Sequence, residues 1–169
     1  MTAPRIWDQC KEPAAVFSPC RTWRYVLTRR WRGGGKVCAF IGLNPSTADE
    51  TLNDPTIRRC MGFAKSWGYS ALYMLNLFGY RATDPAVMRA AADPEGRDNW
   101  AWILRVAQSA DLVVCAWGAH GEFRARADSV ATHLRANGVR LHHLGLTAGG
   151  HPRHPLYLRA DLEPQPWTP

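Results

Sequence analysis

Polar residues stand directly after four apolar stretches of the chain. Asn44, Asn76 and His120 follow the first three stretches, and two histidines, His151 and His154, follow the fourth. Amide and imidazole groups bind and orient polar ligands, and a buried amide without a partner costs about 1 to 3 kcal/mol. Each of these residues must therefore hydrogen-bond to its neighbours or face a ligand, and together they indicate a candidate site for a polar molecule.

The elements that would position these residues follow a regular alternation. Buried strands are predicted by four apolar runs: residues 37–42, 71–78, 111–117 and 139–146. Helices are predicted by three segments of helical spacing: residues 56–67, 93–110 and 122–137. This alternation predicts a three-layer α/β/α fold with a central four-stranded parallel sheet. Because the carboxyl ends of such strands meet at one edge, where ligands bind, we expect the polar residues to share that edge.

The chain before the core has a different composition. Residues 14–17 and 23–31 predict a short N-terminal antiparallel strand pair. Residues 1–36 contain eight lysines and arginines against two acidic residues, which is nearly all of the net charge of +7. Cations interleaved with aromatic side chains can follow a phosphate backbone and stack on bases, and they fit a solvated basic face equally well.

The whole chain of 169 residues is expected to form a single domain. Its parts are the basic, aromatic strand pair (residues 1–36), the α/β core (residues 37–158) and a proline-rich tail (residues 159–169). No apolar run could cross a membrane and no secretory signal precedes the core, so a cytoplasmic monomer without membrane contact is expected. The five cysteines show no CxxC spacing, which favours free thiols. No metal or cofactor motif is present, and we expect neither.

The motifs at the strand ends, taken in order, resemble those of the uracil-DNA glycosylase superfamily. GLNP at residues 42–45 is similar to the GINPG motif of the mismatch-specific and thymine-DNA glycosylase branch, and LNLF at 75–78 falls where classical uracil glycosylases have LLN. CAWGAH at 115–120 resembles an LWG-x-x-A strand, and HPR or HPL at 151–156 resembles the last motif, HPSPL. Still more closely, GLNPSTAD, DPTIRRC, NLF-x-x-RATDP, AWG-x-H-G and RHPLYL together resemble a bacterial and phage family of unknown function.

The glycosylase resemblance implies an N-glycosidic bond hydrolase that flips a damaged or modified uracil-like or thymine-like base out of DNA, double- or single-stranded. It implies that Asn44 positions the water and that His151 or His154 donates to the base, with Asp49 in reserve as the water-activating group. Substrate-binding positions would be Gly42, Leu43, Pro45, Ser46, Asn76, Phe78, His120 and Leu156, the last as a wedge in the duplex. Phosphate contacts would come from Arg29, Arg30, Arg58, Arg59 and Arg153.

Three departures from the glycosylase pattern leave other functions open. The last motif has an extra residue, so His151 and His154 compete for one role. Ser46 stands where the mismatch-specific branch has glycine, and no aspartate takes the water-activating position of the most active branch, which implies slow chemistry. One alternative is a nucleic-acid or nucleotide binding module without catalysis. The other is a hydrolase or transferase that acts on free nucleosides or nucleotides.

Overall fold

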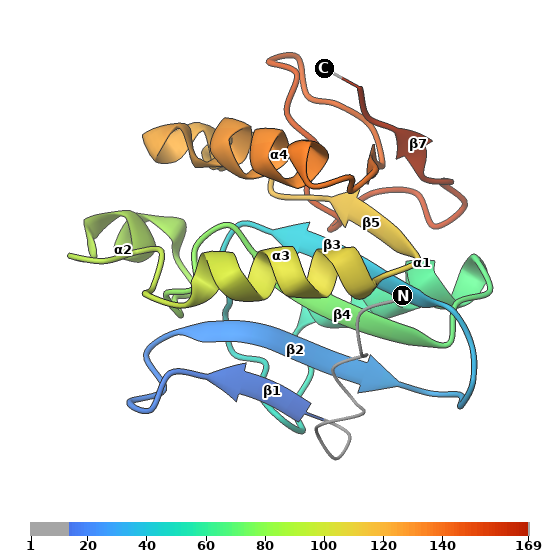
Figure 1. Cartoon of the computed structure of the whole chain (residues 1–169), viewed down its shortest axis with the longest axis horizontal. Coiled ribbons are helices and arrows are strands. Elements are labelled where there is room, and N and C mark those ends of the chain that lie inside the picture. The colour runs from blue at the N-terminus through green and yellow to red at the C-terminus, as the bar shows by residue number, and fades with distance from the viewer. Residues whose placement is uncertain (1–13, 169) are drawn as a thin grey trace.

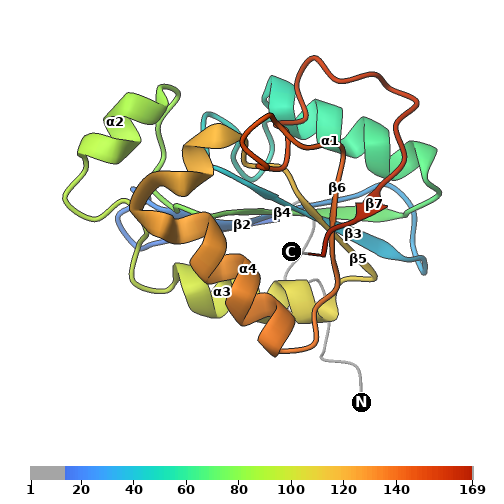
Figure 2. The same cartoon turned by 90° about the horizontal axis from the view of Figure 1, so that it is seen from above.

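A seven-stranded sheet runs through the molecule, with helices on both of its faces (Figures 1 and 2). The computed structural model describes residues 14–168. Its strands are β1 (Ala14–Phe17), β2 (Arg24–Arg30), β3 (Val37–Gly42), β4 (Ala71–Asn76), β5 (Leu112–Cys115), β6 (Leu141–His143) and β7 (Gln165–Pro166). Its helices are α1 (Pro55–Ser66), α2 (Pro85–Ala90), α3 (Asn99–Ser109), the 3-10 segment η2 (Ala119–Ala125) and α4 (Arg126–Ala136).

The strands lie in the order β1-β2-β4-β3-β5-β6-β7. The four central strands, β4, β3, β5 and β6, run parallel to one another. β2 pairs antiparallel with β4, β1 pairs antiparallel with β2, and β7 pairs antiparallel with β6. The expected sheet of four parallel strands is therefore the centre of a larger mixed sheet, and the expected N-terminal strand pair is continuous with it.

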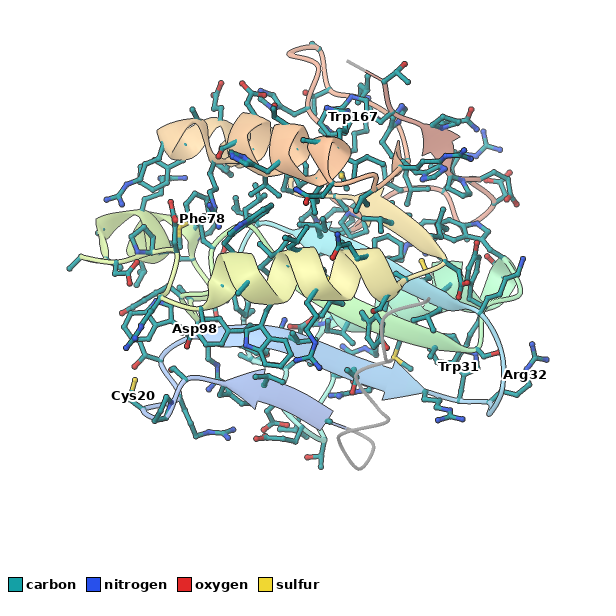
Figure 3. The ribbon with its side chains drawn as sticks, viewed as in Figure 1. Cys20, Trp31, Arg32, Phe78, Asp98 and Trp167 are labelled. Carbon is teal, nitrogen blue, oxygen red and sulfur yellow. The ribbon has the colours of Figure 1, made fainter. Side chains whose placement is uncertain are left out.

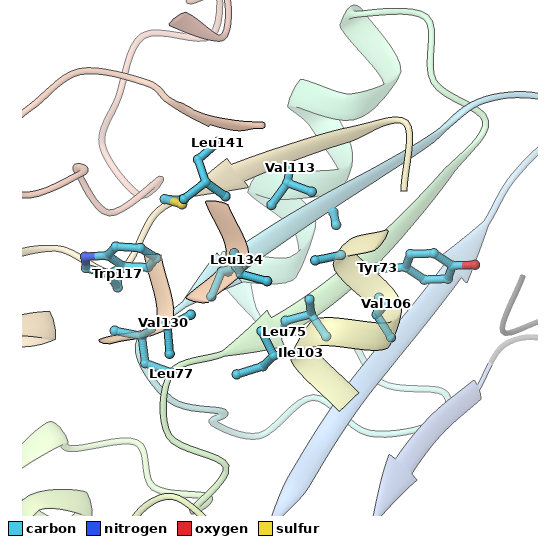
Figure 4. Close-up of a cluster of buried hydrophobic side chains, with 14 of the residues drawn as sticks. Tyr73, Leu75, Leu77, Ile103, Val106, Val113, Trp117, Val130, Leu134 and Leu141 are labelled. Atoms are coloured by element: carbon cyan, nitrogen blue, oxygen red, sulfur yellow. The ribbon is translucent and has the colours of Figure 1, made fainter. Parts of the chain in front are cut away.

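The apolar sequences of β3, β4 and β5 reflect burial on both faces. One face packs against α3 and α4, where Ile103, Val106, Val130 and Leu134 meet alternate strand residues (Figure 4). The other face packs against α1 through Ile57, Cys60, Phe63 and Ala64. Burial of each large side chain contributes about 1.5 to 3 kcal/mol, so the two apolar layers fix the sheet between the helices.

All four parallel strands end at the same edge of the sheet, called here the carboxyl edge (Figure 1). Four segments leave from it: residues 43–54 after β3, residues 77–84 after β4, residues 116–118 after β5 and residues 144–158 after β6. α2 stands beyond the strand ends on this side (Figure 1). This edge is where the sequence predicts the polar residues to gather.

A β-bulge alters the facing of side chains at the start of β2. Phe17 of β1 pairs with Arg24, and Val16 pairs with Val26, so Tyr25 is one extra residue on β2. Tyr25 and Val26 both pack in the apolar layer under α3 and α4. Arg24 instead donates to the backbone of Ala48, which packs under α1. The bulge therefore turns Arg24 toward the α1 face of the sheet.

The last helix begins later than the sequence pattern indicates. α4 starts at Arg126, because Arg124 and Ala125 adopt left-handed backbone angles (φ 55° and 53°) that a continuous helix does not allow. Likewise α3 starts at Asn99 and not near residue 93. Three thiols, Cys38, Cys60 and Cys115, are free and buried, and Cys20 is free and exposed. Cys10 and the rest of residues 1–13 lie outside the described residues.

Candidate functional site

Buried polar atoms without hydrogen bonds mark the carboxyl edge. Within residues 14–168, seven buried side-chain atoms have no partner: Arg24 Nε, Arg59 Nε, Asn76 Nδ2, Arg81 Nε, Asn99 Oδ1, Trp117 Nε1 and Arg126 Nη2. Arg24, Asn99 and Arg126 begin β2, α3 and α4, and Arg59 lies in the first half of α1. Asn76 ends β4, Arg81 follows β4, and Trp117 follows β5. All of these positions belong to the carboxyl edge. Six of the seven atoms are donors, so the edge is suited to a ligand that offers acceptors.

Asn76 is a deeply buried member of this set on the α1 face. Its residue is 2% exposed, and its side-chain oxygen lies against Gly42 at the end of the neighbouring strand. A Cβ at Gly42 would come within 2.9 Å of Asn76 Oδ1 and 2.8 Å of Met74 Cε, so only glycine allows this close approach. The amide nitrogen has no acceptor and is free to donate to a ligand.

His154 approaches the same edge from the segment after β6. The Leu156 N–H donates to His154 Nδ1 at 3.3 Å, so the neutral ring carries its proton on Nε2. His154 is exposed on one side, and partial burial of its ring lowers its pKa, while the Asp54 carboxylate acts in the opposite direction. A neutral imidazole with a free Nε2–H is thus favoured, and it can donate to an acceptor on a ligand.

The lowered pKa values of two histidines predict a loss of stability in weak acid. Burial lowers the pKa of His154 and of His143, and for His143 the positive charge of His142 adds to the effect. Below the ordinary pKa of 6.5, these histidines bind more protons in the unfolded chain than in the folded one. The free energy of unfolding therefore decreases as the pH is lowered. Urea denaturation between pH 7.5 and about 5.5 measures this slope. Replacing both histidines with glutamine should flatten it, and an unchanged slope would contradict this origin.

His151 is turned to a different partner. Its Nε2 lies 3.6 Å from Glu122 in η2, and the backbone around it forms a turn in which Thr147 N–H donates to His151 O. Gly118 N–H donates to Pro152 O at 2.8 Å, which joins this turn to the segment after β5 and places Gly118 against His154. Of the two histidines that the sequence leaves in competition, His154 is the one near Asp54.

Asp54 places a carboxylate within electrostatic range of His154 and Arg24. It is the N-cap of α1, where its Oδ1 accepts the Ile57 N–H at 2.9 Å, and it is 7% exposed. Its charge opposes the burial that lowers the pKa of His154 and of Arg24, which puts it close to both. The sequence indicates only a capping role for Asp54, and its electrostatic influence on His154 and Arg24 depends on the fold.

Asn44 ties two loops together. Its Nδ2 donates to Ala82 O at 2.7 Å and to Pro45 O at 3.2 Å, and the adjacent Ser46 hydroxyl donates to Thr83 Oγ1. The donors of Asn44 are therefore used within the chain, and its Oδ1 is left to orient a water. Of the other expected binding positions, Leu43, Pro45 and Phe78 are buried. Phe78 packs against Phe123 and lies near the start of α3 (Figure 3).

Asp49 and Arg29 hold the loop after β3 in place. Asp49 Oδ1 accepts the N–H groups of Thr51 and Leu52, which lower the pKa of its carboxyl group. Arg29 is buried and donates to Asp49 O, Leu52 O and the Asn53 side chain. The expectation that Arg29 contacts phosphate is corrected by this geometry, because its donors are already bound within the loop.

The remaining predicted positions divide between the carboxyl edge and the opposite edge, where the parallel strands begin. Arg30 pairs with Ala71 at the start of β4, which is the opposite edge, so it does not join the site. Arg58, Arg59 and Arg153 belong to segments of the carboxyl edge, and so does His120, whose Nδ1 lies 3.0 Å from Arg89 Nη1. Leu156 is half-buried in the segment after β6.

Tyr157 is a rim residue that the sequence analysis missed. It is fully exposed and adopts a left-handed backbone angle (φ 66°), which is strained for a residue with a Cβ. Its ring extends from the segment that carries His154 and Leu156. Its only signal in the sequence is its place next to the HPL motif.

A cavity of about 810 Å³ lies away from these groups, at the amino end of β5 and the last turns of α3 and α4. Its lining includes Tyr69, Asp111, Arg140 and His142, and none of the unpartnered buried atoms. Within residues 14–168, no group of three or more His, Cys, Asp or Glu side chains could hold a metal ion. No helix in this part of the chain has the length and apolar character to span a membrane.

Comparison with known proteins identifies a family without assigning a reaction. No curated protein and no solved structure matches the chain. One family model matches residues 24–156, a range that runs from Arg24 through the four parallel strands to Leu156 and so includes the residues of the carboxyl edge. The chain therefore belongs to the family described as "Protein of unknown function (DUF1643)".

Proposed function

We propose that this protein hydrolyses the N-glycosidic bond of a damaged or modified base in DNA, with its catalytic groups at the carboxyl edge. The observation that carries the proposal is the amide of Asn76 at the end of β4. This amide is buried, its nitrogen has no acceptor, and its oxygen lies against Gly42 at the end of β3. A uracil-like or thymine-like base presents carbonyl oxygens that accept from such a donor. The similarity of the GLNP, LNLF and HPL motifs to those of the uracil-DNA glycosylase superfamily points to the same class of substrate.

The proposed mechanism uses four side chains, two that act on the water and two that donate to the base. A water attacks C1′ of the sugar, the bond from C1′ to the base nitrogen breaks, and its electron pair leaves with the base. Asp54 accepts the proton of the attacking water, and Asn44 Oδ1 helps to orient that water. His154 donates from Nε2 to an oxygen of the base, while Asn76 donates to its polar edge, so the negative charge on the leaving base is stabilised. The released base finally takes up a proton.

Binding outside the pocket would involve the rim. The exposed ring of Tyr157 can stack on a neighbouring base or fill the space that a flipped base leaves, and it reaches further out than the half-buried Leu156. Arg58, Arg59 and Arg153 can take phosphates of the strand. A module that binds DNA without catalysis would keep these contacts, with affinity that falls steeply as salt rises, and would release no base.

Base release tests the proposal directly. The purified protein is incubated with duplex and single-stranded oligonucleotides that carry uracil, hydroxymethyluracil, mismatched thymine or hypoxanthine, and the products are heated in alkali. We expect strand breaks at abasic sites, with a rate about 100 to 1000 times lower after His154→Gln. The matched change His151→Gln should leave the rate within about twofold, because that ring faces Glu122.

Mass spectrometry of bases released from host and phage DNA extends the substrate range beyond these four lesions. If neither the oligonucleotides nor these DNAs lose a base, the hydrolase proposal fails. If a base is released and the two histidine variants behave alike, the assignment of the donor to His154 fails while the reaction stands.

A further inference from the structure

Arg24 carries a buried charge that the chain does not pair. It is 2% exposed, its Nη1 donates to Ala48 O at 2.9 Å, and its Nε is buried without an acceptor. The ion pairs within residues 14–168 do not include it. Burial lowers the pKa of Arg24 to about 10, an effect that Asp54 opposes and that the charges of Arg81 and Arg29 increase. Buried guanidinium groups are normally paired with an anion, so this one is suited to receive one.

A second cation, Arg81, lies near Arg24 and likewise has a guanidinium nitrogen without an acceptor. Its Nε is buried without an acceptor, and its Nη1 donates only to the backbone of Arg21 at 3.3 Å. Its guanidinium stacks on the Phe17 ring at 4.8 Å, which fixes its plane without neutralising it. Arg81 is half-buried, so this side of the pair is open to solvent. Two neighbouring guanidinium groups repel each other until an anion lies between them.

Both arginines belong to the carboxyl edge. Arg24 begins β2, where its N–H donates to Gly79 O in the segment after β4, and Arg81 follows two residues later in that segment. The bulge at Tyr25 turns Arg24 to the α1 face, which is the face on which Asn76 meets Gly42. The two guanidinium groups and the Asn76 amide therefore offer unpartnered donors from the start of β2, the end of β4 and the segment after β4.

We propose that Arg24 and Arg81 form a phosphate-binding site, and, resting on the proposed function, that this phosphate belongs to the nucleotide whose base meets Asn76. The guanidinium groups of Arg24 and Arg81 each have a nitrogen without an acceptor, and the guanidinium fork matches the oxygens of a phosphate in a two-point contact. The phosphate can be the terminal group of a free nucleotide or a diester within a strand, since both present the same oxygens.

Binding to the wild-type protein gives the first test. Inorganic phosphate is titrated and followed by phosphorus NMR and calorimetry, and each common deoxynucleoside 5′-monophosphate is compared with its nucleoside. We expect phosphate to bind and at least one monophosphate to bind tenfold or more tightly than its nucleoside, as charge-assisted hydrogen bonds predict. If phosphate does not bind and the phosphate group adds nothing to any nucleoside, the proposal is wrong.

Three substitutions locate the bound phosphate. Arg24→Gln and Arg81→Gln should each weaken phosphate binding about tenfold or more, while Arg140→Gln removes an exposed cation at the opposite edge and should change it less than twofold. If Arg24→Gln does not fold, the half-buried Arg81 and its control decide. Equal binding by Arg81→Gln and wild type would overturn the site.

Further arms of the experiment separate the source of the phosphate and the two proposals. A gain for the monophosphate alone identifies a free nucleotide, and an equal gain for a dinucleotide with an internal diester identifies a strand. Phosphate binding without base release leaves the site intact and removes the hydrolase. If a base is released and neither Arg24→Gln nor Arg81→Gln changes the rate or the affinity, the phosphate site is wrong and the hydrolase proposal stands.

Discussion

Replacing Asp54 with asparagine should slow base release by about 100- to 10,000-fold while leaving the fold unchanged. A general base typically contributes a factor of this size, and asparagine cannot accept the proton of the attacking water. Asparagine is as good an N-cap as aspartate, so the hydrogen bond from Ile57 N–H at the start of α1 is retained. Single-turnover kinetics on the best substrate from the base-release assay, together with urea denaturation, measure the two effects separately.

Asp49→Asn is the matched control for this change. Asp49 also caps backbone N–H groups with its Oδ1, but it does so in the loop that Arg29 holds. Its removal of charge should change the rate by less than about threefold, in line with a surface substitution. A rate that falls for Asp49→Asn and not for Asp54→Asn would assign the water-activating role to Asp49, the reserve candidate of the sequence analysis.

Gly121→Ala should lower the free energy of unfolding by about 3 kcal/mol, at the upper end of the cost of overpacking a core. A Cβ at Gly121 would lie 2.3 Å from Trp117 Cδ1, and the Trp117 ring is 1% exposed. Trp167 packs edge-on against that ring at 5.6 Å beside α4 (Figure 3), so the indole has little room to move. Chemical denaturation at constant pH gives the change in unfolding free energy.

Gly62→Ala provides the comparison for the same chemical change. Gly62 is an exposed residue within α1, and nothing lies within 4 Å of the added Cβ. Alanine should therefore stabilise the protein by about 0.5 to 1 kcal/mol, because it restricts the unfolded chain and favours helix. Similar effects for the two variants would show that Trp117 yields to the added methyl group.

The parallel centre of the sheet could be predicted because its sequence signals are local. Buried strands such as β3 and β4 are nearly uniform runs of apolar residues, and Asp54-Pro55 marks the start of α1 in the sequence alone. β7 carries no such signal, because its two exposed residues are held by partners far along the chain. Trp167 N–H donates to Leu141 O, and Arg135 donates to Trp167 O.

Only those residues of the candidate site that follow a recognisable strand could be placed from the sequence. Asn76 and His154 follow apolar runs, so their place at the carboxyl edge follows from the strands that precede them. Asp54 and Arg81 have ordinary surroundings in the sequence, and their relation to Arg24 depends on how three loops meet. Arg29 and Arg30 are adjacent in the sequence, yet one is buried in a loop contact and the other lies at the opposite edge.

The bulge at Tyr25 decides which face of the sheet the Arg24 side chain meets. Side chains alternate between the faces of a strand, so in an unbulged β2 of the same length Arg24 would share the face of Val26, and the bulge places it on the opposite face. Without it, Arg24 would project into the apolar layer under α3 and α4, among side chains such as Val26 and Leu75. Deleting Tyr25 would therefore remove the bulge and keep Arg24 opposite Phe17 on the α1 face, whereas a change that straightened β2 at its present length would move this cation into the apolar layer.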